Sequence, residues 1–147
     1  MEKFVFSNGQ ALGTLNSTGV ISTNIWDLEE GVSVDQMVIG WVNGIILSST
    51  NSAGGTEGLI IEVRSSDAEA LATTPMYLGS RVLMSSEIVT GFRFSIGIYA
   101  TALKKYLGVW YRAFNTSLDG ATSVDARFEL HPHEALRVQK KNTSTGA

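Results

Sequence analysis

Cysteine is absent from the 147 residues of the chain, which excludes thiol catalysis, zinc–thiolate sites and a disulfide framework. Charged residues are also scarce, at 17% against the ~25% of an average soluble domain. Glycine, serine and threonine take their place with 15, 16 and 13 residues, a composition that favours turns and strands over helices. The hydrophobic content of 44% is too high for a disordered chain. The composition and length therefore predict one folded, β-rich domain.

Long basic runs and long hydrophobic runs are missing as well. The largest basic runs, Lys104-Lys105 and Lys140-Lys141, are dipeptides and the net charge is −3, so we expect no nucleic-acid partner. The longest apolar stretch, residues 37–47, is interrupted by glycines and an asparagine and falls short of the ~20 residues of a membrane-spanning helix. The opening residues turn polar at Ser7-Asn8-Gly9, unlike a secretion signal. We therefore expect a soluble protein that binds no membrane.

Alternation of apolar and polar residues is the strongest pattern in the sequence. In Phe92–Tyr99 the even positions are Phe, Phe, Ile and Ile, and the odd positions are Arg, Ser, Gly and Tyr. Such alternation is typical of a half-buried strand, and clusters of turn residues separate the alternating segments. The pattern predicts about eight strands, near residues 3–6, 20–28, 38–48, 57–65, 76–85, 91–99, 106–114 and 121–130. Only residues 67–72 look helical.

Many short strands with turns between them indicate an all-β protein, and a count near eight favours a jelly-roll-type two-sheet sandwich. We expect a single β-sandwich domain over residues 1–131. The polar C-terminal tail, residues 132–147, is expected to be partly disordered or an extended arm.

Two expected strands, residues 38–47 and 106–114, are apolar on both faces, which predicts central strands whose outer face is also covered. In the second strand, alternation places Leu107, Val109, Tyr111 and Ala113 in the core and Tyr106, Trp110 and Phe114 on the opposite face. We interpret Trp26 and Trp41 as core residues. Because Tyr106, Trp110 and Phe114 need a cover, either a second layer or a partner must supply it, and self-association through them is our prediction.

The same aromatic residues allow other interpretations. Tyr106 and Trp110 lie four residues apart on one strand face, with Gly108 between them. Such a pair can stack a sugar ring, as in a carbohydrate-binding module. It can also belong to a core, because large aromatic side chains dominate the packing of many cores. A carbohydrate-binding β-sandwich is therefore the alternative function.

Side chains that could carry out chemistry are few and scattered. His131 and His133 have a metal-ligand spacing, but a proline separates them and no carboxylate cluster completes a ligand set. No serine lies in a nucleophile motif. The carboxylates Glu62, Asp125 and Glu129 occupy the polar half of alternating strands, where surface charge is expected. We therefore predict no catalytic residue, no metal, no cofactor and no enzymatic activity.

Arginines recur on the expected strands. We expect some of them to pair across strands with Glu62 and Glu129; the four are Arg81, Arg93, Arg112 and Arg127. The resulting polar face is either a solubilising surface or a docking surface for another protein.

Several segments across residues 4–130 share their order and character with one known family. They are Phe6–Leu12, Ser22–Leu28, Leu59–Val63 with the following Ser65-Ser66-Asp67, Glu87–Phe94, Lys105–Val109 and Ala126-Arg127-Phe128. In these segments the chain resembles the capsid cement, or decoration, proteins of short-tailed bacteriophages. It departs from their pattern in residues 131–147, which extend beyond the usual final strand. The loop at residues 48–58 is a second region whose role the resemblance does not indicate.

The resemblance implies a jelly-roll sandwich on the outside of an icosahedral head. It implies that the protein bridges adjacent subunits of the major capsid protein, has no enzymatic activity and needs no cofactor. A homodimer or another symmetric homo-oligomer is the expected state. The expected location is the exterior of the virion, and the host cytoplasm during assembly.

Four residues are candidate contacts with the capsid protein. Phe4 and Phe6 could belong to an arm that docks on a neighbour, or simply to an ordinary edge strand. Lys104 and Lys105, at a turn, could meet an acidic capsid surface, or could be solvated turn residues.

Overall fold

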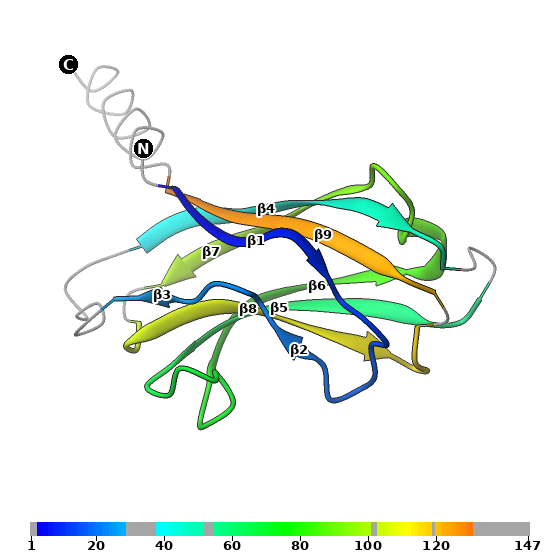
Figure 1. Cartoon of the computed structure of the whole chain (residues 1–147). Helices are drawn as coiled ribbons and strands as arrows, with labels where there is room; N and C mark the ends of the chain where they lie inside the picture. The colour runs from blue at the N-terminus through cyan, green and yellow to red at the C-terminus, as the bar shows by residue number, and fades with distance from the viewer. Residues whose placement is uncertain (1–2, 29–37, 52–54, 101–102, 119, 131–147) are drawn as a thin grey trace, which may run out of the picture.

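Nine strands and one turn of 3-10 helix make up the part of the chain that the structure, a computed structural model, describes (Figure 1). The described residues are 3–28, 38–51, 55–100, 103–118 and 120–130. The strands are β1 (Lys3–Ala11), β2 (Val20–Ile21), β3 (Trp26–Asp27), β4 (Val38–Ser49), β5 (Gly58–Ser66), β6 (Met76–Met84), β7 (Arg93–Ala100), β8 (Tyr106–Phe114) and β9 (Thr122–Leu130), and the 3-10 turn is η1 (Ser85–Glu87). The expected strands therefore agree with the observed ones to within a few residues at most ends, although the first continues to Ala11 and the second is interrupted.

The strands form two antiparallel sheets that lie one above the other in Figure 1. One sheet has four strands in the order β1-β9-β4-β7. The other has five strands in the order β2-β8-β5-β6, with β3 also paired to β8. Both short strands β2 and β3 run along the same neighbour, so together they act as one interrupted strand.

The pairing of the strands is nested, and this makes the sandwich a jelly roll. The first strand pairs with the last (β1 with β9), the interrupted second with β8, β4 with β7, and β5 with β6. The pairs β4–β9 and β5–β8 then join these ribbons into the two sheets. A long antiparallel ribbon wrapped in this way is the double Greek key of jelly-roll proteins. The prediction of an all-β, two-sheet jelly-roll sandwich is confirmed.

The core lies between the sheets and takes every second side chain of the central strands. All four residues predicted to face the core from β8 are buried. They pack with inward side chains of the adjacent β5 and of the facing sheet, which include Leu59, Ile61 and Val63 of β5, Val124, Ala126 and Phe128 of β9, and Phe94, Ile96 and Ile98 of β7. Alternation was therefore a reliable guide to the inner faces.

The outer face of β4 corrects one expectation. The strand is central, as predicted, but its outward Trp41 is 41% exposed, so this tryptophan is a surface residue and not a core residue. Trp41 pairs with Gly97 of β7, and a side chain at Gly97 would meet the Trp41 ring at 2.9 Å. The ring therefore lies over a glycine instead of under a covering layer. Trp26, by contrast, packs against the core as predicted.

The expectation of a helix at residues 67–72 is also wrong, because the structure has bends and a turn there. Leu71 has a φ of 58°, which a right-handed helix does not allow, and its side chain has no exposed surface. The Leu71 side chain instead packs over Gly108 on the outside of the five-stranded sheet. The predictions for residues 132–147, for His131 and His133 and for part of the 48–58 loop lie outside the described residues.

Candidate functional site

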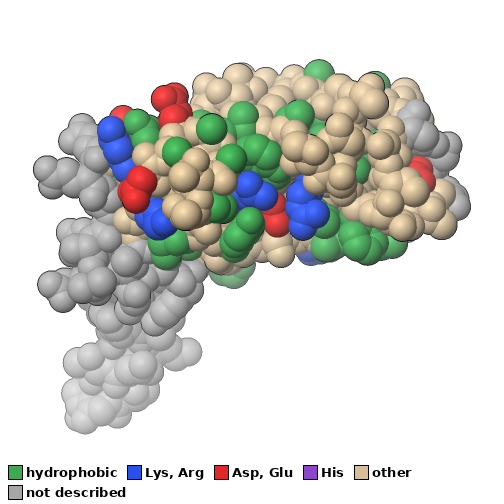
Figure 2. Space-filling view, turned by 90° about the horizontal axis from the view of Figure 1, so that it is seen from below, with side chains coloured by type: hydrophobic (Ala, Val, Ile, Leu, Met, Phe, Trp, Pro, Cys, Tyr) green, Lys and Arg blue, Asp and Glu red, His purple; other side chains and the backbone are tan. Residues whose placement is uncertain are grey.

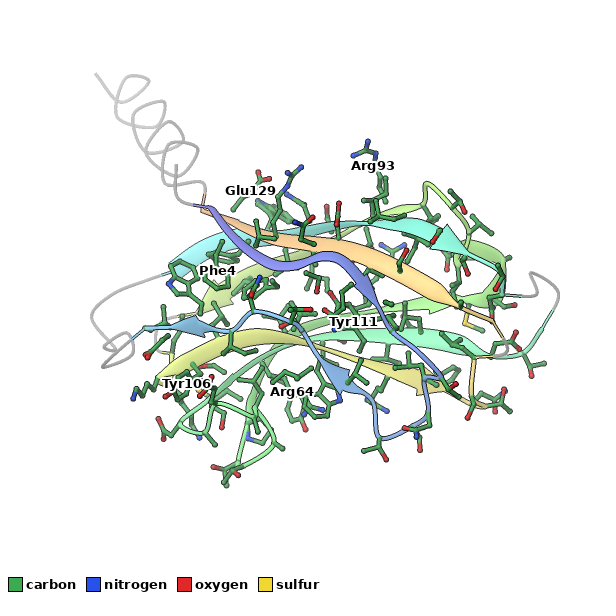
Figure 3. All side chains as sticks on the ribbon, viewed as in Figure 1. Phe4, Arg64, Arg93, Tyr106, Tyr111 and Glu129 are labelled. Carbon is green, nitrogen blue, oxygen red and sulfur yellow. The ribbon has the colours of Figure 1, made fainter. Side chains whose placement is uncertain are left out.

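Phe4 and Phe6 lie on β1, one of the two edge strands of the four-stranded sheet. Phe6 has no exposed surface, and the half-buried Phe4 stacks on Trp26 with ring centroids 5.3 Å apart (Figure 3). Both residues therefore belong to an edge strand that is paired with β9. Phe6 is not available to a partner in the folded chain, because its ring is part of the core.

Lys104 and Lys105 both make contacts within the chain. The Lys104 Nζ donates a hydrogen bond to the Thr74 carbonyl at 2.7 Å, and its backbone N–H donates to the Ser65 hydroxyl. The Lys105 Nζ lies 5.0 Å from the centre of the Tyr106 ring, and its side-chain hydrogen bond with Tyr106 raises the pKa of Lys105. Both ammonium groups are thus positive charges held at one end of the sandwich.

Tyr106 and Trp110 share the outer face of β8 but do not form an open platform. A side chain at Gly108, which lies between them, would meet Leu71 Cδ1 at 2.6 Å and Ile25 Cδ1 at 2.7 Å. These two aliphatic side chains therefore occupy the space above Gly108. Trp110 is also held, because its Nε1 donates to the Thr18 carbonyl at 2.9 Å. The second layer that the sequence required is supplied here by the chain itself.

Phe114 stands apart from these two aromatics and is 42% exposed. On the outer face it is separated by Gly58 from Met84, because Gly58 pairs with both residues. Met84 is 44% exposed and Val82, two residues along β6, is 41% exposed. These three exposed apolar residues, Val82 and Met84 of the edge strand β6 and Phe114 at the end of β8, are called the Phe114 patch. The Tyr106, Trp110 and Phe114 set is therefore divided, and only Phe114 is largely exposed.

A charged cluster lies beside the Phe114 patch on the same face, where Figure 2 shows basic and acidic side chains close together among hydrophobic ones. Glu62 contacts Arg64 Nη2 at 2.7 Å and Arg112 Nε at 3.4 Å. The Arg64 guanidinium also lies between two rings, 4.4 Å from the centre of Trp110 and 5.1 Å from that of Tyr77. The side chains of Glu62 and Arg64 are only 9% and 10% exposed, so this is a desolvated ion pair on the outside of a sheet.

Sequence reasoning missed the role of Arg64. Arg64 lies on the same strand face as Glu62, but nothing in the local sequence shows that a loop folds over that side. The spacing of Glu62 and Arg64, two residues apart on one strand face, was the available signal. Of the four arginines expected to pair across strands with Glu62 and Glu129, Arg112 pairs with Glu62. Glu129 instead pairs with Arg127 of its own strand at 3.1 Å, and Arg81 pairs with Glu87 at 3.6 Å.

The outer face of the four-stranded sheet carries exposed apolar residues of its own. They are Val5 of β1 and Trp41 and Leu47 of β4, each between 38% and 45% exposed. They are spread among polar side chains, among them Arg93, which points away from the sandwich in Figure 3. We call this surface the Trp41 face. The parity of Trp41, opposite to that of the buried Val42 and Ile46, could have placed it outside.

Groups that could support metal binding are not assembled in the described part of the chain, where no three histidine or acidic residues come together. Asp125 accepts a hydrogen bond from the Gly9 N–H at 2.7 Å, while Glu62 and Glu129 are engaged with arginines. No helix among the described residues has the length and hydrophobicity of a membrane crossing. Comparison of the chain with protein-family models and with curated proteins gave no match.

Proposed function

We propose that this protein is a capsid cement protein, which binds the outside of an icosahedral phage head and bridges adjacent major capsid protein subunits. One observation carries the proposal: exposed apolar side chains lie on both outer faces of the sandwich, in the Trp41 face and in the Phe114 patch. A bridging protein needs at least two contact surfaces that it can use at once, because weak contacts then add through multivalency.

The fold supports the same function. The resemblance to cement proteins implies a jelly roll, and the nested strand pairing is that of a jelly roll. Jelly rolls serve many functions, so the fold agrees with the proposal without carrying it.

The two surfaces differ in a way that suggests different partners. The Phe114 patch has three exposed apolar residues with a charged cluster of both signs beside it. Such a patch suits an isologous contact between two copies of the chain, in which each surface meets itself. The Trp41 face has tryptophan and arginine among polar residues, a composition typical of contacts with a different protein.

The carbohydrate-binding alternative has less support from the geometry. Leu71 and Ile25 fill the space between Tyr106 and Trp110, so a flat sugar ring does not find two open aromatic faces there. A fluorescence titration with soluble glycans separates the functions, since sugar stacking would quench tryptophan emission of the free protein.

Heads that lack the protein test the proposal. We expect them to assemble and then to break at a lower temperature than complete heads, because the bridges between subunits are missing. Adding the purified protein back should restore the higher temperature. Heads that survive heating equally well with and without the protein would contradict the proposal.

A further inference from the structure

A hollow of about 230 Å³ lies on the Trp41 face, where β1 leaves its regular pairing with β9. The register advances from Val5 opposite Arg127 to Gln10 opposite Val124, so β1 contributes extra residues and bulges. The Gly9 N–H in this bulge donates to Asp125 at 2.7 Å, and the φ of +63° at Gly9 suits glycine. Bulges often lie beside binding sites because they redirect side chains and interrupt pairing. The hollow is therefore formed by the sheet itself, at the bulge in β1.

Two arginines line the hollow, with one carboxylate. Arg93 of β7 and Asp125 of β9 flank Ile45, which pairs with both, and Arg127 pairs with the neighbouring Asn43. Arg93 makes no ion pair with any carboxylate of the described residues, and Arg127 uses its Nε for Glu129, which leaves its terminal nitrogens. Asn43 accepts a hydrogen bond from the Ser95 hydroxyl through Oδ1, so its amide N–H groups remain as donors. The hollow thus offers donors to an anion.

The charges select among anions. Of the two arginines, Arg127 already has Glu129 as a carboxylate partner, so among the described residues Arg93 is the guanidinium of the lining without one, which suits a monoanion. A doubly charged phosphate would meet repulsion from Asp125, whereas a carboxylate accepts paired N–H groups from a guanidinium and carries a single charge. Val5 and Ile45 add apolar lining that suits the methylene groups of an acidic side chain.

We propose that this hollow binds the carboxylate of an aspartate or glutamate side chain of a partner protein, with Arg93 and Arg127 as its ligands. If the partner is the major capsid protein, an assignment that rests on the proposed function, the Trp41 face is the side that meets the shell. Trp41 and the arginines then belong to one contact surface, in keeping with the residue types that dominate binding energy at protein interfaces.

A titration of ¹⁵N-labelled protein followed by NMR tests the proposal with three probes at constant ionic strength: glutamate capped at both backbone ends, equally capped glutamine, and inorganic phosphate. We expect capped glutamate to shift the Arg93 and Arg127 Nε–H signals and the Asn43 amide signals saturably. Capped glutamine should cause no saturable shift, and phosphate should bind more weakly than capped glutamate. Loss of one charge-assisted contact in Arg93→Gln should weaken capped-glutamate binding about tenfold.

Arg81→Gln is the matched control, because Arg81 lies on β6 of the other sheet and outside the hollow. It should bind capped glutamate as the unaltered protein does, and the amide spectrum of each variant shows that it is folded. Equal binding of glutamine and glutamate, the absence of saturable shifts, preference for phosphate, or unchanged binding by Arg93→Gln would each overturn the proposal. The test uses the free protein, so its result is independent of the heating test on heads.

Discussion

Replacing Glu62 by glutamine should destabilise the fold far more than the loss of a surface charge does. Glu62 and Arg64 are each about nine-tenths buried, so the substitution leaves the Arg64 charge in a poorly solvated site between Trp110 and Tyr77. Breaking a buried ion pair by removing one partner costs about 3–5 kcal/mol. That is a large part of the roughly 5–15 kcal/mol by which a domain is stable, and it lowers Tm by roughly 6–20 °C.

Urea unfolding and calorimetry measure this loss, and Arg81→Gln provides the comparison. The Arg81–Glu87 pair spans 3.6 Å with side chains 42% and 32% exposed, so its removal should cost about 0–1 kcal/mol. The double variant Glu62→Leu/Arg64→Met should recover most of the stability, because no charge is then left buried. If Glu62→Gln lowers the free energy of unfolding no more than Arg81→Gln does, Glu62 does not balance the charge of a desolvated Arg64. Our account of this cluster is then wrong.

Three further predictions follow from other parts of the sandwich. Burial raises the pKa of Tyr111, so above about pH 10 the unfolded chain loses a proton that the folded chain keeps, and the free energy of unfolding should fall by up to about 1.4 kcal/mol per pH unit. Tyr111→Phe should flatten this slope in urea unfolding at alkaline pH, and an unchanged slope would show that Tyr111 does not cause it. Gly44→Ala should cost about 1–3 kcal/mol in the same assay, because its Cβ would lie 2.6 Å from the Asp125 carbonyl and against the Phe94 ring; a neutral effect would show that the sheet relaxes there. Phe114→Ser should shift the protein towards monomers in sedimentation velocity with little change in Tm. An unaltered assembly state would show that the Phe114 patch is not the contact between copies.

The sequence was sufficient for the strands and for their inner faces. Alternation over residues 106–114 separated Tyr111 from Trp110 correctly, because successive side chains of a strand point to opposite faces. The number of strands indicated the jelly roll, although the pairing of β1 with β9 joins segments at opposite ends of the chain and has no local signal. Such long-range pairing is decided by the packing of the whole core.

The outer faces were harder to predict, for a physical reason. Whether an outward side chain is covered depends on where a loop folds, and alternation does not record this. Leu71 covers Gly108 and so closes the space between Tyr106 and Trp110, whereas Trp41 is 41% exposed and no loop within the described ranges covers it in this way. The same limitation applies to the hollow, since it depends on a bulge in β1 that only the register reveals.

Co-sedimentation of the purified protein with shells assembled from the major capsid protein of the same source tests the central claim most directly. We predict saturable binding at a fixed ratio to capsid subunits, with weaker binding by Arg93→Gln and unchanged binding by Arg81→Gln. If the unaltered protein stays in the supernatant at every concentration of mature shells, the protein is not a capsid cement protein.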